Sequence, residues 1–125
     1  GYRGISLDNS SVTIQKNTIR YQSQSGIYAT GNGCDNAPVT CNTITLNSNY
    51  GLAAAGGAQP LITSNNFIGN TAYGVYNYSS NTSDKVTANG NWWNNRKGPS
   101  RGDKISANVT VTTYLTALSA CAPAP

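Results

Sequence analysis

The 125-residue sequence contains no histidine, no methionine and no glutamate, and only 10% of its residues are charged. Without histidine, the chain cannot build the common nucleophilic triads or the majority of metal sites. Its acidic side chains are four aspartates on separate stretches of the chain: Asp8, Asp35, Asp84 and Asp103. Glycoside hydrolysis needs two carboxyl groups about 5–10 Å apart, and no spacing here brings two aspartates together. We therefore expect no catalytic residue, no metal and no cofactor.

Other missing features narrow the possibilities further. No Cys-x-x-Cys motif is present, which disfavours a structural zinc site. The net charge is only +4, and the basic residues are not interleaved with aromatics as in nucleic-acid-binding proteins. The chain has neither a signal peptide nor an apolar run long enough to span a membrane. Because it begins inside a repeat, we interpret it as a processed product or a fragment.

The polar residues that are abundant are asparagine, serine and threonine. These side chains compete for backbone hydrogen bonds and therefore favour turns and strands over helices. Asparagine and glycine also tolerate the left-handed backbone of tight turns. The composition is thus typical of a parallel β-helix, in which short strands alternate with tight turns.

A repeat of roughly 22 to 25 residues runs through the first ninety positions. Each unit begins with a glycine followed by an apolar residue, at Gly4, Gly26, Gly51 and Gly74, which are 22, 25 and 23 residues apart. A fixed period of this length predicts a solenoid, whose units bury their apolar faces only against one another. In the third unit we expect strands at 51–54, 61–63 and 66–68.

Each unit also contains a second apolar segment that ends in an asparagine. These asparagines are Asn17, Asn42, Asn65 and Asn89, at steps of 25, 23 and 24 residues. We predict that their side-chain amides stack into a hydrogen-bonded ladder along the solenoid. Two residues after the first three asparagines come Ile19, Ile44 and Phe67, which we expect to form a column inside the core.

The three cysteines leave their pairing open. Cys34 and Cys41 flank a single turn and could close a small loop as a disulfide. Cys121 lies in an alanine- and proline-rich tail, where it is either free or available for an intermolecular bridge.

The regular repeat ends at two adjacent tryptophans, Trp92 and Trp93. These rings either stack on sugars or plug the open end of the core, and their position favours the plug. A basic loop follows, containing Arg96, Lys97, Arg101 and Lys104. It is either a solvated loop or, together with the tryptophans, a contact surface for an acidic glycan. A last strand is expected at residues 108–115.

This terminal segment resembles that of a known family. The matching stretches are Lys85 to Trp93, Gly98-Pro99-Ser100, Gly102-Asp103-Lys104-Ile105-Ser106 and Asn108-Val109-Thr110-Val111. They resemble right-handed parallel β-helix proteins of the NosD-like and exported prokaryotic surface type. The resemblance covers nearly the whole chain and implies an all-β, right-handed parallel β-helix of four to five coils. Members include polysaccharide lyases, epimerases, adhesins and surface-layer components, so the implied function is broad.

Family members usually have more coils and an N-terminal cap, neither of which is visible here. An uncapped coil leaves backbone groups unpaired, and stacking of identical copies head to tail would cover them. We therefore predict an exported, non-enzymatic structural solenoid that assembles with copies of itself into a cell-surface or extracellular fibre, sheath or layer. The alternative is a carbohydrate-binding or lyase/epimerase-like β-helix acting on an acidic glycan. In both cases residues 1–94 form the coils and 95–125 the loop, strand and tail of the same domain.

Overall fold

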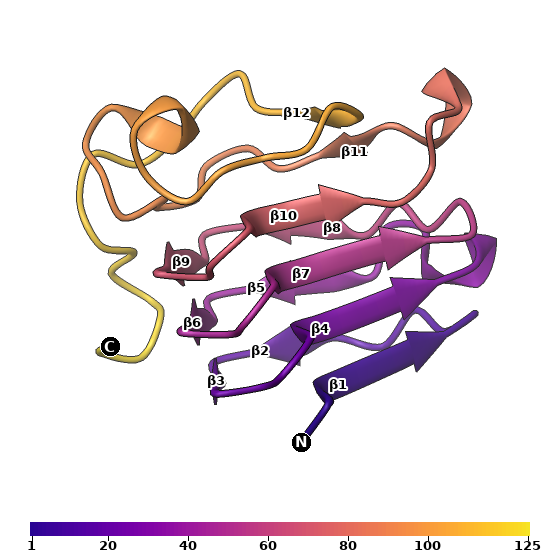
Figure 1. Ribbon diagram of the computed structural model, residues 1–125, viewed down its shortest axis with the longest axis horizontal. Coiled ribbons are helices and arrows are strands. Elements are labelled where there is room, and N and C mark those ends of the chain that lie inside the picture. The colour runs from indigo at the N-terminus through magenta and orange to yellow at the C-terminus, as the bar shows by residue number, and fades with distance from the viewer.

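The computed structural model describes all residues, 1–125, and shows short strands stacked in parallel rungs (Figure 1). The first sheet consists of β1 (Arg3–Asp8), β4 (Ser25–Thr30), β7 (Tyr50–Ala55) and β10 (Tyr73–Asn77). The second sheet has β2 (Ile14–Gln15), β5 (Pro38–Thr40) and β8 (Leu61–Thr63), and the third has β3 (Thr18–Arg20), β6 (Thr43–Thr45) and β9 (Asn66–Ile68). The strands predicted in the third repeat are thus confirmed as β7, β8 and β9.

The remaining elements are short. β11 (Val86–Thr87) and β12 (Val109–Thr110) form a two-stranded parallel sheet at the C-terminal end of the stack. Three 3₁₀ turns are present, η1 (Asn32–Cys34), η2 (Thr82–Asp84) and η3 (Gly98–Ser100). There is no α-helix, and hence none that could span a membrane. Of the strand predicted at 108–115, only β12 is present, and Tyr114 adds an isolated parallel bridge to Asn91.

Identical positions of successive coils lie directly above one another, and this register builds the core. In the first sheet, Ile5 pairs with Ile27, Ile27 with Leu52, and Leu52 with Val75. The column predicted two residues after the ladder asparagines is confirmed, since Ile19 pairs with Ile44 and Ile44 with Phe67. All except Ile5 are buried in one continuous apolar cluster.

The repeated glycines are needed because each faces this second column. A Cβ built on Gly26 would lie 3.0 Å from Ile44 Cγ2, and one on Gly51 would lie 2.9 Å from Phe67 Cδ1. The carbonyl oxygen of the next coil's glycine is also within 2.8 Å in both cases. Such distances leave no room for a side chain. The glycine recurs once in each coil because the first sheet packs too closely against side chains of the third sheet to admit any larger residue.

The predicted asparagine ladder is confirmed for three members and wrong for the fourth. Asn17 Nδ2 donates to Asn42 Oδ1 at 3.1 Å, and Asn42 Nδ2 donates to Asn65 Oδ1 at 3.0 Å. Asn65 Nδ2 then donates to Asn91 Oδ1 at 3.1 Å, whereas Asn89 accepts from the backbone of Thr112. Asn91 lies 26 residues after Asn65, whereas the earlier ladder steps are 25 and 23 residues, so the ladder position falls on Asn91 and not on Asn89.

A second ladder, which the sequence analysis missed, lies between the third sheet and the first. Asn47 Nδ2 donates to Asn70 Oδ1 at 2.9 Å, and Asn70 Nδ2 donates to Asp103 Oδ2 at 2.9 Å. Asp103 also accepts from the backbone N–H groups of Gly69 and Asn70. Each asparagine of this ladder donates its side-chain N–H to the next residue. A carboxylate can only accept hydrogen bonds, so Asp103 is the last member of the ladder.

The cysteine pairing differs from the expected one. Cys41 and Cys121 form a disulfide that joins positions 80 residues apart, and Cys34 is free and buried. The thiol of Cys34 faces the core, where it lies 3.4 Å from the carbonyl oxygen of Thr30. Cys41 instead lies at the outer bend after β5, beside the returning C-terminal tail. The proposed Cys34–Cys41 loop and the intermolecular bridge through Cys121 are therefore both wrong.

Candidate functional site

The outward face of the first sheet carries a cluster of five tyrosines, hereafter the tyrosine cluster. Tyr28 lies on β4, Tyr50 on β7, Tyr73 and Tyr76 on β10, and Tyr78 directly after β10. The register explains the gathering, because Tyr73 pairs with Tyr50 and because both Tyr28 and Tyr76 pair with the small residue Ala53. The rings close over Ala53, which is fully buried although it lies at an outward position.

The rings contact one another in both stacked and edge-to-face geometries. Tyr50 and Tyr76 stack with centroids 4.5 Å apart and planes 14° apart. Tyr78 meets Tyr76 edge-on at 4.8 Å and Tyr28 edge-on at 6.4 Å. Both arrangements are favourable because the electron-rich ring faces and electron-poor edges attract one another. The cluster is thus a preformed, partly exposed aromatic surface across three consecutive coils.

One cation belongs to this surface. The guanidinium carbon of Arg3 lies 3.6 Å from the centroid of the Tyr28 ring, and Arg3 Nε donates to Gln24 Oε1 at 2.9 Å. Gln24 Nε2 in turn donates to the Tyr78 hydroxyl at 3.4 Å. The contact with the Tyr28 ring and the hydrogen bond to Gln24 hold the guanidinium in place. Of its nitrogens, only Nε donates in this hydrogen bond. The terminal nitrogens of Arg3 can therefore donate to an anionic ligand.

A hollow of about 490 Å³ adjoins the cluster on its C-terminal side. Its lining includes Tyr73, Tyr76, Tyr78, Ser79, Ser106 and Asn108. It combines aromatic rings with hydroxyl and amide groups. Burial, together with the neighbouring Tyr50 hydroxyl, raises the pKa of Tyr78 to about 12. Its phenol is therefore neutral over the physiological range.

The residues that the sequence analysis proposed for a glycan lie elsewhere. Trp93 is fully buried and stacks on Phe67 with centroids 4.9 Å apart, so a sugar cannot reach it. It lies two residues after Asn91 and extends the core column of Ile19, Ile44 and Phe67. The plug interpretation is thereby confirmed, and glycan contact by Trp93 is wrong.

The other proposed contacts lie at the C-terminal end. Trp92 is half-buried and bridges to Asn66 at the edge of β9. The basic side chains are exposed: Arg96, Lys97, Arg101 and Lys104. Glycan binding by Trp92 and this loop remains a prediction. Asp103, in the same loop, is buried and accepts from the second ladder.

Three of the four aspartates are engaged in local structure. Asp35 accepts from the backbone N–H of Gln59 at 3.0 Å, and Asp84 accepts from Ser79 Oγ at 2.7 Å. Burial raises the pKa of Asp103, while the hydrogen bonds from Asn70 and Gly69 oppose that shift. No group of three or more cysteine or aspartate side chains is placed to hold a metal ion.

A second hollow of about 410 Å³ lies over β8 on the second sheet. It is lined by polar and charged side chains that include Asp35, Gln59, Thr63, Lys85 and Asn89. Gln59 Nε2 crosses it at one end to the carbonyl oxygen of Lys85. It offers hydrogen-bonding groups but no aromatic face. The tyrosine cluster is therefore the stronger candidate for binding an extended ligand.

The family model for the right-handed β-helix region matches residues 1–113. This chain is a right-handed β-helix protein. Searches of curated proteins and of solved structures found no match. A right-handed β-helix can carry many functions, so the fold assigns neither ligand nor activity. The narrower likeness to NosD-like proteins stays a prediction.

The tyrosine cluster of this β-helix was not found from the sequence. Two of its members directly precede repeat glycines, in Tyr50-Gly51 and Tyr73-Gly74. This pattern could have revealed that large rings recur at one outward position. Tyr28 and Tyr76 share a second outward position, two residues after Gly26 and Gly74, and Tyr78 lies just beyond β10. Only the register shows that these positions meet.

Proposed function

We propose that this protein is an exported, non-enzymatic β-helix that binds an acidic polysaccharide across the tyrosine cluster. The observation that carries the proposal is the set of five partly exposed tyrosine rings, each in contact with at least one other, with Arg3 fixed over Tyr28. Tyrosine offers a flat apolar face to the C–H groups of a sugar ring and a hydroxyl to its polar edge. The guanidinium of Arg3 can bind a carboxylate with two parallel hydrogen bonds.

The dimensions of the cluster favour a polymer over a single sugar. Its members extend from β4 through β7 to β10, and successive rungs are about 4.8 Å apart. The aromatic surface is therefore about 10 Å long before the adjoining hollow is counted. A few consecutive sugar rings could lie on it, with the carboxylate of one acidic sugar close to Arg3 at the N-terminal end.

The proposed location and lack of catalysis rest on different observations. A disulfide between Cys41 and Cys121 is compatible with an extracellular protein, because such bonds persist in oxidising compartments. In the contacts described above, no two aspartates face each other across the tyrosine cluster, so the cluster has no pair of carboxyl groups for acid–base chemistry. We therefore assign the cluster a binding role.

Titration calorimetry with a uronic-acid polymer and a neutral polymer of similar length tests this proposal. We expect the acidic polymer to bind, and Tyr50→Ala and Tyr76→Ala to weaken it about tenfold, equivalent to about 1.4 kcal/mol. Arg3→Gln should remove the preference for the acidic polymer. Tyr21→Ala is the matched control, because Tyr21 is exposed on a turn outside the cluster. The proposal fails if neither polymer binds, or if Tyr21→Ala weakens binding as much.

Assembly into a fibre, sheath or layer, the other prediction from the sequence, has less support. Cys121 is used within the chain and cannot link copies. At the C-terminal end, Ile105 bridges to Val75 on β10 and Trp92 bridges to Asn66 on β9. These contacts occupy the edges onto which a second copy would stack head to tail. Sizing of the purified protein over a range of concentrations would detect such assembly.

A further inference from the structure

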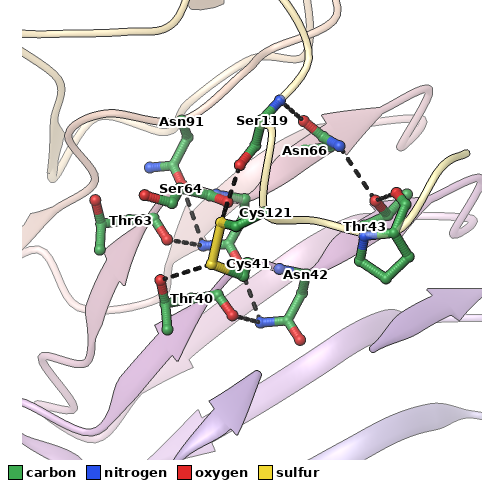
Figure 2. The surroundings of a disulfide bond; sticks show 12 residues. Thr40, Cys41, Asn42, Thr43, Thr63, Ser64, Asn66, Asn91, Ser119 and Cys121 are labelled. Atoms are coloured by element: carbon green, nitrogen blue, oxygen red, sulfur yellow. Dashed lines mark hydrogen bonds between the residues drawn. A yellow bond between two sulfur atoms is a disulfide. The ribbon is translucent and has the colours of Figure 1, made fainter. Parts of the chain in front are cut away.

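The C-terminal segment 116–125, hereafter the strap, turns back along the side of the stack. Figure 1 shows this yellow segment descending past β9 and β6 towards the N-terminal coils. The disulfide between Cys41 and Cys121 joins the strap to the bend after β5 (Figure 2). The strap therefore runs back towards the N-terminal end of the stack and lies over coils that are about 80 residues earlier in the sequence.

The strap covers the outward face of the third sheet. Its backbone contacts two side chains there: Ser119 N donates to Asn66 Oδ1 at 2.8 Å, and Thr43 Oγ1 donates to the carbonyl oxygen of Pro123 (Figure 2). Asn66 and Thr43 are 1% and 0% exposed. The equivalent residue of the first coil, Thr18, pairs with Thr43 but lies beyond the strap and is exposed.

Few contacts other than the disulfide hold the strap. Ser119 is its only buried residue, and no strap residue belongs to the apolar core. The two side chains that its backbone hydrogen-bonds, Asn66 and Thr43, are polar and would be hydrated if the strap left. Neither asparagine ladder includes a strap residue. The strap can therefore leave without removing a structural part of the coils.

We propose that the Cys41–Cys121 disulfide is a redox-sensitive latch whose reduction frees the strap and uncovers the outward face of β6 and β9. Cys121 is exposed, so a thiolate from a dithiol reductant can reach its sulfur. The thiolate bonds to Cys121 Sγ, and Cys41 leaves as a thiolate that takes up a proton. The second thiol of the reductant then closes its own disulfide and releases Cys121. Two electrons and two protons pass to the protein, and the reductant is oxidised.

Hydrogen exchange measured by NMR on the oxidised and reduced full-length protein tests this latch. On reduction with a dithiol, we expect at least tenfold faster exchange of the Ser119 amide. Amides of the first sheet, such as those of Leu52 and Val75, should keep their protection. Cys121→Ser should reproduce the reduced state without reductant. Cys34→Ala is the control, because it removes the other thiol and leaves the latch intact.

Two results would overturn the proposal. If Ser119 keeps its protection in the reduced protein and in Cys121→Ser, the non-covalent contacts alone hold the strap. If the first sheet loses protection together with Ser119 in both, the disulfide is an integral part of the folded coils and not a latch. Limited proteolysis gives an independent readout, since a free strap should be cleaved on reduction while the coils resist.

Discussion

Aromatic rings gather in two regions of this molecule, and the two gatherings have similar geometry. Phe67 and Trp93 stack at 4.9 Å within the core, and Tyr50 and Tyr76 stack at 4.5 Å on the outward face of the first sheet. The difference lies in exposure, because Trp93 is fully buried whereas the tyrosines reach the surface. Stacking by itself therefore says nothing about function. The side of the sheet on which a ring lies decides whether it is packed in the core or accessible from solvent.

The position of a ring relative to the repeat determines that side. Trp93 lies two residues after Asn91, as Phe67 lies two residues after Asn65, and both side chains point inward. Tyr50 and Tyr73 instead directly precede Gly51 and Gly74, the glycines of the first sheet that pack against the core column. The first region should therefore respond to substitution by losing stability, and the second by losing binding.

Removal of the buried ring should give the largest effect. Trp93→Ala is expected to lower the free energy of unfolding by about 3–5 kcal/mol, because it leaves a cavity above Phe67. Urea denaturation followed by circular dichroism measures this change. Trp93→Phe, which keeps an aromatic ring on the column, should cost clearly less. A loss below about 1 kcal/mol for Trp93→Ala would show that the terminal coil contributes little to the core.

Two asparagines that directly precede the tryptophans sharpen the comparison, because only Asn91 belongs to the ladder. Asn91→Ala should cost about 2–3 kcal/mol, because Asn91 Oδ1 accepts from both the backbone and the side chain of Asn65, which is fully buried. Asn89→Ala is the matched control and should cost less than about 1 kcal/mol, since Asn89 Oδ1 accepts only from exposed groups of Thr112 and Thr113, beyond β12. Thermal or urea unfolding ranks the two variants. A larger loss of stability for Asn89→Ala than for Asn91→Ala would mean that Asn89, and not Asn91, is the ladder member.

Substitutions on the exposed side should cost little stability. Tyr50→Ala and Tyr76→Ala each remove one stacked pair, which is worth about 0.5–1.5 kcal/mol, and leave the core columns intact. Unfolding should therefore stay cooperative while polysaccharide binding falls. Tyr50→Phe retains the ring and is the control for the hydroxyl group. A stability loss as large as that of Trp93→Ala would mean that the cluster is a structural element.

The smallest effect concerns the ionisation of one phenol. The pKa of Tyr78 is raised from 10.0 to about 12, mainly by burial beside the other tyrosines. A raised folded-state pKa means that Tyr78 contributes stability below pH 10, which is lost as the pH rises through about 12. Ultraviolet difference titration of the wild type against Tyr78→Phe measures this ionisation. A transition near 10 would show that the cluster leaves Tyr78 fully hydrated.

The periodic part of this structure could be predicted from the sequence, and the terminal part could not. The strands of the third repeat, the column through Ile44 and three ladder asparagines follow from near-constant spacing. The end of each column depends on residues that break the period. Asn89 fits the spacing of the ladder better than Asn91 does, and only the large apolar residue two positions later favours Asn91.

The candidate site and the disulfide were harder to foresee, because both depend on contacts between distant segments. Asp103 ends the second ladder from a loop 33 residues beyond Asn70. Cys121 reaches Cys41 only because the tail turns back along the stack. The tyrosines meet through coil register combined with differing positions in the repeat, which no single periodic pattern describes.

The most direct test of the account is an NMR titration that maps where a uronic-acid polymer binds. The account predicts that amide shifts concentrate on β4, β7 and β10 and on Tyr78, with the side chain of Arg3 also affected. Amides in segment 92–104 should remain unchanged. Shifts confined to that segment would contradict the account and return the binding role to Trp92 and the basic loop.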